Sequence, residues 1–194
     1  MASLPTHLPN GQRTLIRDAV MAEPARTRER TARVLQQLYG ASPHWPAFQQ
    51  ALASVLDAFV VSDRTAAVAE ASTRALLDLL TWKGQTLRSS DLPARPGRSQ
   101  RLADLATGVS ARTYLCGSGG MRYLDVRPFV ASGITVTPFN ASVAGLCEAA
   151  HQISAVRALM QFGPHHLVDE LRTKLQRWSD TCDERLVVSP KGPQ

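Results

Sequence analysis

Residues 117–120 are the part of this sequence whose residue types could best hold a substrate. They are Gly117, Ser118, Gly119 and Gly120, and we call them the glycine segment. Three glycines in four positions allow positive φ angles and leave backbone N–H groups uncovered. Such a loop can bind the oxygen atoms of a phosphate or a carboxylate. A tight turn from a strand into a helix explains the same residues equally well, so both interpretations stay open.

Polar side chains on both sides of the glycine segment could add to a ligand site. Candidates are Tyr114, Tyr123 and Asp125. Asp125 is expected mainly as the N-cap of a short helix over 126–132, and the tyrosines as packed side chains with satisfied hydroxyls. A nucleophilic thiol needs a neighbouring base, and the sequence places none beside Cys116. Cys116 is therefore expected to be a buried structural cysteine. The catalytic residues, if there are any, stay unassigned.

Several established motifs are absent around these residues. The third glycine of a dinucleotide fingerprint would fall at Arg122, and no Gly-Lys-Ser/Thr of a P-loop follows. Ser118 is not in a Gly-x-Ser-x-Gly elbow. The three cysteines form no CxxC, and the adjacent His165 and His166 would point to different sides of a helix. The sequence therefore indicates no metal site and no particular cofactor.

Strand and helix patterns alternate around this candidate site, which predicts an α/β fold. The expected β-α-β-α-β unit spans about 85–139, with strands near 85–88, 112–116 and 134–139. Crossovers of this kind make neighbouring strands parallel. Ligands of such sheets bind beyond the carboxyl ends of the strands, and the glycine segment directly follows the second strand.

The rest of the chain is predicted to be mainly helical. Three amphipathic helices between 24 and 83 should form one layer, and two more helices should follow at 153–162 and 165–178. The expected apolar stripes are Thr31, Val34, Leu35 and Leu38; Phe48, Leu52, Val55, Leu56 and Phe59; and Val68, Ala71, Ala75, Leu76, Leu79 and Leu80. Ser99 is expected to cap a helix over 100–107.

The ends of the chain complete this organisation. Asn10-Gly11 predicts a tight turn between strands at 4–8 and 14–20. We expect a single domain over 1–180, followed by a flexible tail over 181–194.

The composition limits the function classes. The formal net charge is +6, and most of the cationic residues are arginines, which suit bidentate binding of phosphate or carboxylate. A charge of this size allows nucleic-acid binding without implying it. No apolar run approaches the roughly 20 residues of a membrane span, and no secretory signal opens the chain. These features favour a cytoplasmic protein and leave its oligomeric state open.

The central residues also resemble a known family. Thr113-Tyr-Leu-Cys-Gly-Ser-Gly-Gly, then Tyr123-Leu-Asp, Phe129 and Gly133-Ile-Thr-Val are similar to the signature of the WbqC-like family. The family's usual opening, a His-Gln-Pro-like stretch followed by an Asp-Asp-Val segment, is absent, so we expect an N-terminally incomplete member. Arg157 stands where the family pattern favours Asp.

The resemblance implies a bacterial protein of polysaccharide (O-antigen) or natural-product assembly. It suggests an acyl- or aminoacyl-type transferase acting on a small-molecule or carrier-bound anionic substrate. The alternatives are a non-catalytic module that binds an anionic ligand and, ranked third, a nucleic-acid-binding protein.

Overall fold

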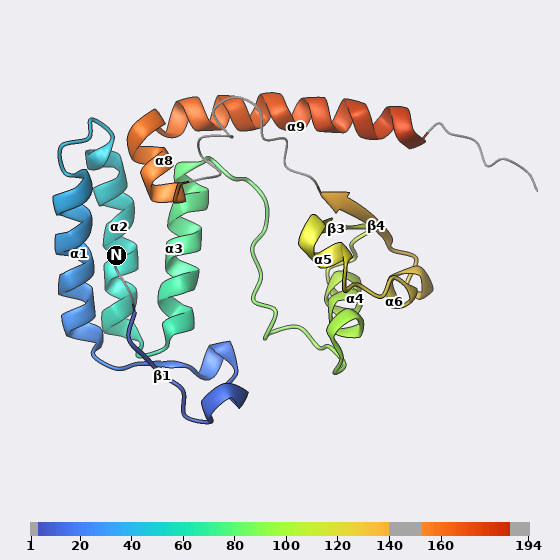
Figure 1. The fold of residues 1–194 in the computed structure, drawn as a ribbon, viewed down its shortest axis with the longest axis horizontal. Coiled ribbons are helices and arrows are strands. Elements are labelled where there is room, and N and C mark those ends of the chain that lie inside the picture. The colour runs from blue at the N-terminus through green and yellow to red at the C-terminus, as the bar shows by residue number, and fades with distance from the viewer. Residues whose placement is uncertain (1–3, 140–152, 187–194) are drawn as a thin grey trace, which may run out of the picture. The chain divides into compact units, whose positions relative to one another are not determined.

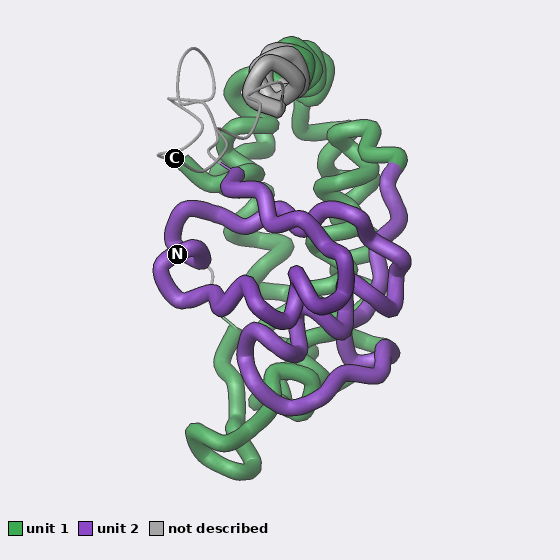
Figure 2. Tube along the Cα trace, turned by 90° about the vertical axis from the view of Figure 1, so that its right-hand side faces the viewer, with its two compact units in different colours: residues 1–83, 143–194 green, residues 84–142 purple. Residues whose placement is uncertain are grey.

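The computed structural model (Figure 1) describes residues 4–139 and 153–186. It has the predicted mixed α/β fold, in which helices outnumber strands. The chain divides into two compact units, unit 1 with residues 1–83 and 143–194 and unit 2 with residues 84–142 (Figure 2). Within the described ranges, no helix combines the length and the apolar character that crossing a membrane requires.

Unit 1 contains the predicted three-helix layer. Its helices are α1 (Pro24–Tyr39), α2 (Trp45–Val61) and α3 (Thr65–Leu79). Prolines stand in the first turns of α1 and α2, where their missing N–H groups cost no hydrogen bond. Apolar residues recur at helical spacing along each helix, so burial of one face per helix holds the layer together.

The core of unit 1 confirms most of the predicted stripe positions. Its buried members are Met21, Trp45, Phe48, Leu52, Val55, Phe59, Val68, Ala75, Ala158, Leu159, Met160 and Leu167. The predicted apolar stripe of α1 is wrong at its last position, Leu38, whose side chain is 63% exposed. The residues of α1 that face the core include Thr27, which is buried, and Leu35 and Tyr39, which pack against the cluster.

The N-terminal segment forms a short antiparallel pair. Strands β1 (Thr6–His7) and β2 (Val20–Met21) pair as predicted for this region, although both are much shorter than expected. The prediction of a tight Asn-Gly hairpin was wrong, since two 3₁₀ turns lie between the strands. They are η1 (Gly11–Arg13) and η2 (Ile16–Asp18). Apolar alternation is weak here, and local i→i+3 hydrogen bonds replace a ladder.

Two further helices complete the described part of unit 1, α8 (Ala155–Phe162) and α9 (Pro164–Leu186). Ser154 caps α8, because its side chain accepts a hydrogen bond from the Arg157 N–H. Gly163 separates the two helices with φ +79°, which only glycine adopts readily. Helix α9 continues past the predicted end at Trp178 and includes the first residues of the expected tail.

Unit 2 is built on a parallel strand pair. Strands β3 (Thr113–Gly117) and β4 (Thr135–Phe139) run in register from Thr113 opposite Thr135 to Gly117 opposite Phe139. Helices α4 (Arg98–Gly108), α5 (Ser118–Met121) and α6 (Arg127–Ala131) surround this pair. The buried core consists of Ala103, Ala106, Phe129 and Ile134. The predicted parallel pairing of these two strands is therefore confirmed.

The predicted first strand of this unit, at 85–88, is wrong. Residues 85–88 have no regular structure, and β3 and β4 form a two-stranded sheet among the described residues. Leu87, the large apolar residue of this stretch, is 52% exposed. One apolar side chain offers too little burial to hold a strand against the sheet. The order of elements in the unit is therefore α-β-α-α-β instead of β-α-β-α-β.

Arginines fasten the irregular segment that precedes α4. The Arg95 backbone N–H and guanidinium donate to both oxygens of Asp104, at 2.7–3.0 Å. Arg101 donates to the Ser89 carbonyl at 3.2 Å. These contacts order the segment without a strand.

Candidate functional site

The glycine segment lies where the parallel pair ends. Gly117 is the last residue of β3, opposite Phe139 of β4, and α5 begins directly at Ser118. All four residues of the segment are exposed. Carboxyl ends of parallel strands meet at one edge of a sheet, which is the edge that ligands of α/β folds occupy. The predicted position of the segment is thus confirmed.

The backbone of the glycine segment forms the tight turn from a strand into a helix, which is one of the two interpretations that the sequence left open. Gly117 has φ −62° and ψ 154°, and none of the three glycines has a positive φ. The segment is a direct turn from a strand into a helix, and the alternation of right- and left-handed residues that makes an anion nest is absent from it. A four-residue helix also contributes little macrodipole.

The three glycines differ in what a side chain would meet. A Cβ at Gly117 or Gly119 would have no atom within 4 Å. Both positions therefore leave open space over the exposed turn, where a ligand can approach the backbone closely. At Gly120, a Cβ would lie 2.8 Å from the Sγ of Cys116, so this glycine is required by packing.

Tyr114 belongs to the core of unit 2. Its ring lies 4.8 Å from the ring of Phe129, centroid to centroid, with a 40° tilt. Burial raises the pKa of the Tyr114 phenol, and the charge of an ionised Cys116 would raise it further. Tyr114 was predicted as a site residue, but its side chain packs against the core of unit 2 and supports the strand pair.

Tyr123 lies close to the glycine segment and is 69% exposed. Its backbone N–H donates to the Gly120 carbonyl at 3.0 Å. The guanidinium of Arg98 lies 6.0 Å from the centre of its ring, a distance at which a cation is attracted to an aromatic face. Tyr123 and Arg98 thus connect the glycine segment to the start of α4.

Asp125 acts as a local structural carboxylate. Its Oδ1 accepts from the Arg127 backbone N–H at 3.0 Å, and the Arg127 guanidinium donates to both carboxylate oxygens at 2.8–3.1 Å. The side-chain and then the backbone hydrogen bonds from Arg127 lower the pKa of Asp125 below its ordinary value. The prediction that Asp125 is the N-cap of the helix that follows is wrong, because Val126 holds the N-cap position of α6 and no side chain caps it. The Asp125 carboxylate is ionised and engaged by Arg127 at neutral pH, which suits a structural role better than that of a general base.

The prediction that Ser99 caps α4 is wrong. Gly97, with φ +106°, holds the N-cap position of α4, and Ser99 lies inside the first turn. The Ser99 hydroxyl accepts a hydrogen bond from the Asp125 N–H at 2.9 Å. Ser99 therefore links α4 to the segment that enters α6, a contact between residues 26 positions apart that local sequence patterns do not reveal.

Cys116 is a buried free thiol, as predicted. Its Sγ donates to the Gly117 carbonyl at 3.6 Å. Residues 84–142 contain no histidine, so unit 2 supplies no imidazole base to activate the thiol. A structural role follows from these contacts, and a catalytic thiolate has no support in this unit.

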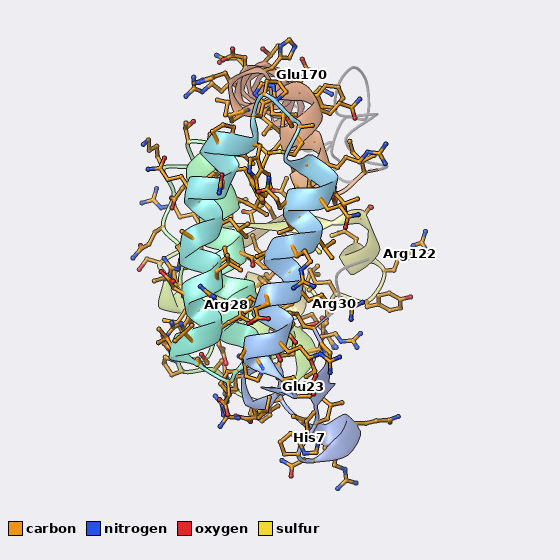
Figure 3. The ribbon with its side chains drawn as sticks, turned by 90° about the vertical axis from the view of Figure 1, so that its left-hand side faces the viewer. His7, Glu23, Arg28, Arg30, Arg122 and Glu170 are labelled. Carbon is orange, nitrogen blue, oxygen red and sulfur yellow. The ribbon has the colours of Figure 1, made fainter. Side chains whose placement is uncertain are left out.

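Charge is the feature of unit 2 that the motif analysis missed. Residues 84–142 contain seven arginines and three aspartates, without lysine or glutamate, and so carry a formal charge of +4 out of the +6 of the whole chain. Two aspartates pair with Arg95 and Arg127. Arg98 and Arg122 have no carboxylate partner among the described residues, and Arg122 extends away from the ribbon (Figure 3). A count of the charged residues in each segment of the sequence would have shown that residues 84–142 carry most of the net charge.

Comparison with known proteins identifies the family of this chain. The model of the WbqC-like protein family matches residues 2–166. The chain belongs to the WbqC-like protein family. The matched range includes all of unit 2, so the resemblance noted around the glycine segment is confirmed. No curated protein and no solved structure matches the chain.

Helix α1 in unit 1 of this WbqC-like protein carries arginines that differ in exposure. Arg26, Arg30 and Arg33 of α1 are exposed, and Figure 3 shows Arg30 directed away from the helices. Arg28, in contrast, reaches across to α2, where its Nε donates to the Leu56 carbonyl at 3.0 Å. The described residues contain no cluster of histidine, cysteine and carboxylate side chains that could hold a metal ion.

Proposed function

We propose that this WbqC-like protein is an acyl- or aminoacyl-type transferase of bacterial polysaccharide or specialised-metabolite biosynthesis. Its substrate site is the exposed glycine segment at the carboxyl edge of the β3–β4 pair. The observation that carries this proposal is the open space over Gly117 and Gly119, at the edge where ligands of parallel sheets bind. Family membership supports the biosynthetic setting.

The charge of unit 2 supports an anionic donor. Activated acyl groups are carried on phosphorylated groups, as thioesters of phosphopantetheine or as adenylates. A unit with net charge +4 attracts such a donor. Arg98 and Arg122, which lack carboxylate partners in the described ranges, are available for its phosphates. Arg122 directly follows α5, so it lies beside the glycine segment.

The chemistry that these residues support is direct transfer. Cys116 is buried and Asp125 is held by Arg127, so neither is placed to form a covalent intermediate. In a direct transfer, an acceptor amine or hydroxyl attacks the acyl carbon, the bond to the carrier breaks, and the acceptor proton leaves to solvent. Holding donor and acceptor together can supply several kcal/mol of the barrier reduction without a protein nucleophile.

The lack of an activated nucleophile in unit 2 favours a second candidate, a non-catalytic module that binds an anionic ligand. A transfer assay separates the two. The purified chain is incubated with acyl-coenzyme A thioesters or aminoacyl adenylates and with amino-sugar and amine acceptors, and products are detected by mass spectrometry. Acylated acceptor above the protein-free rate supports the transferase. Saturable donor binding without product supports the binding module, and the absence of both contradicts the glycine-segment site.

A further inference from the structure

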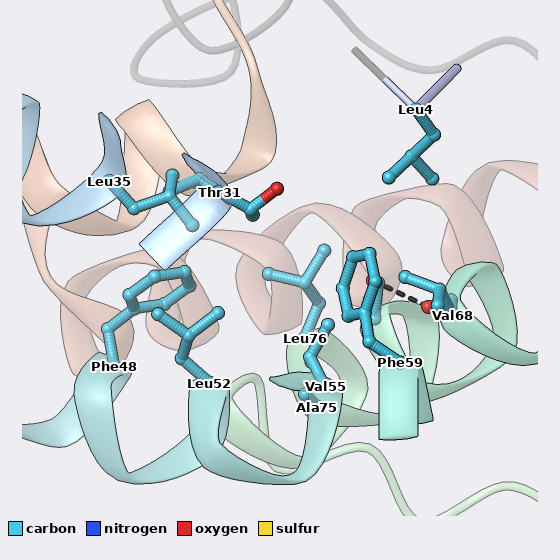
Figure 4. A pocket seen from close by; sticks show the side chains of 12 residues that line it. Leu4, Thr31, Leu35, Phe48, Leu52, Val55, Phe59, Val68, Ala75 and Leu76 are labelled. Atoms are coloured by element: carbon cyan, nitrogen blue, oxygen red, sulfur yellow. Dashed lines mark hydrogen bonds between the residues drawn. The ribbon is translucent and has the colours of Figure 1, made fainter. Parts of the chain in front are cut away.

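Unit 1 contains a cavity that the proposed transfer chemistry does not use. It lies between α1, α2 and α3, has a volume of about 220 Å³ and is partly open (Figure 4). Its walls are formed by Leu4, Thr31, Leu35, Phe48, Leu52, Val55, Phe59, Val68, Ser72, Ala75, Leu76 and Val156. Every one of these described residues belongs to unit 1.

The walls determine what kind of molecule can enter. Among the residues that the structure describes, no charged side chain lines the cavity, and the polar groups on its walls are the hydroxyls of Thr31 and Ser72. Ser72 donates its hydroxyl to the Val68 carbonyl at 2.7 Å, within its own helix. Two or more polar partners are needed to hold a water molecule, and an apolar cavity of about 150 Å³ stays dry and can accept benzene. The cavity therefore suits a hydrocarbon group.

The shape of the cavity favours a chain over a ring. Its wall on α2 runs from Phe48 to Phe59, which is about 16 Å at 1.5 Å per residue. A volume of about 220 Å³ distributed along that length makes a narrow space. It is too narrow for a helix of a partner protein, whose diameter is about 10 Å. An unbranched alkyl chain fits these dimensions.

Thr31 adds a polar contact to this apolar space. Within the described ranges no hydrogen bond involves its hydroxyl, and Figure 4 shows the oxygen directed toward the space between Leu76 and Leu4. Both residues line the cavity. A free hydroxyl beside a hydrocarbon site can donate to the carbonyl oxygen of an acyl group, while any charged group of the ligand stays outside the apolar walls.

The geometry points to a binding site for an unbranched, medium-length acyl chain in unit 1, with the acyl carbonyl hydrogen-bonded by Thr31. The chain can arrive as a free fatty acid or as a thioester, because both carry the same hydrocarbon chain and an oxygen that accepts a hydrogen bond, on the carboxylate of the acid or on the carbonyl of the thioester. This inference does not depend on the proposed transfer at the glycine segment, since it concerns binding within unit 1.

Titration calorimetry with octanoate, decanoate and decanoyl-pantetheine tests the site on the full chain. Each methylene that enters the cavity should tighten binding about fourfold, as expected for burial of a CH₂ group. Thr31→Val, which keeps the shape and removes the hydroxyl, should weaken binding about fivefold. Tighter binding of decanoate assigns a free fatty acid, and tighter binding of the thioester assigns a carrier-borne chain.

Variants of α3 separate cavity binding from non-specific adsorption. Ala75→Leu fills the cavity and should abolish binding while the melting temperature is kept or raised. Ala69→Leu makes the same change at an exposed position of the same helix and should bind like the wild type. Leu76→Ala enlarges the cavity and should move the tightest binding to longer chains. Equal binding by the Ala75 variant, or affinity that does not change with chain length, would overturn the inference.

Discussion

A Cβ atom placed on Gly120 would lie 2.8 Å from the Sγ of Cys116, the buried thiol at the end of β3. A Cβ on the neighbouring Gly119 would touch nothing within 4 Å. One glycine of the segment is therefore fixed by packing against the strand, whereas the other is free of packing constraints and faces open space.

This contrast gives a stability prediction for the two glycines. Gly119→Ala should raise the free energy of unfolding by up to about 1 kcal/mol, because alanine costs less backbone entropy than glycine in a helix. Gly120→Ala should lower it by about 1 kcal/mol net, because overpacking costs about 1–3 kcal/mol. Urea denaturation measures both. In a Cys116→Ala background the Gly120 penalty should disappear, and a persistent penalty would refute the contact.

The left-handed residue at the end of α3 provides a second prediction. Thr81 has φ +53°, a conformation that costs a β-branched residue about 1–2 kcal/mol. Its N–H donates to the Asp78 carbonyl at 2.9 Å, which closes the helix. Thr81→Gly should therefore stabilise the protein by about 1 kcal/mol. Thr73→Gly, inside the same helix, should destabilise it by about 0.3 kcal/mol. In thermal denaturation, Thr81→Gly should raise the melting temperature and Thr73→Gly should lower it.

Acid should weaken the Arg95–Asp104 contact. Hydrogen bonds from the side chain and backbone of Arg95 hold the pKa of Asp104 well below its ordinary value, and its side chain is only 14% exposed. A carboxyl with a lowered folded-state pKa stabilises the fold above its unfolded pKa of about 3.9, and this stability is lost as pH falls toward the folded value. The melting temperature of Asp104→Asn should lie below that of the wild type at pH 7.

The same pair of proteins checks the sign of this pH dependence. The difference in melting temperature between wild type and Asp104→Asn should shrink as pH falls below about 4, because protonation then removes the same charge from the wild type. A difference that stays constant from neutral to acid pH would show that the ionised carboxylate does not hold the segment before α4.

The thiol of Cys116 is predicted to be dispensable for function. It contacts the Gly117 carbonyl and has no histidine within its unit. Cys116→Ser should therefore keep acyl-transfer or ligand-binding activity largely intact, although some stability is lost because a buried hydroxyl is harder to accommodate than a thiol. Loss of a covalent nucleophile costs several orders of magnitude in turnover, so an inactive but folded serine variant would make Cys116 catalytic.

Regular local patterns predicted much of the fold. The stripe from Phe48 to Phe59 repeats over about three helical turns. Strands β3 and β4 were recognisable because β-favouring residues flank a segment long enough for a crossover helix. In each case the decisive information lies in the residue types of the element itself and of the segments directly beside it.

Features that depend on distant partners could not be predicted in this way. The stretch at 85–88 has acceptable strand composition, yet it lacks enough apolar surface to join the sheet. Ser99 has the residue type of a cap, but the Asp125 N–H, far along the chain, binds its hydroxyl. The glycine segment allows several backbone conformations, so composition alone does not select the right-handed turn that it adopts.

The central claim, that the open face of the glycine segment receives an anionic acyl donor, is tested most directly at Gly119. Calorimetric titration of acetyl-coenzyme A, or of a sulfamoyl analogue of an aminoacyl adenylate, should show saturable binding to the wild type. Gly119→Val places a branched side chain in space that is empty in the folded protein, so the fold should persist while affinity falls at least about tenfold. Gly108→Val, whose Cβ meets only Leu92 at 3.9 Å, should bind the donor normally. Unchanged affinity in a folded Gly119→Val variant would contradict the proposed site.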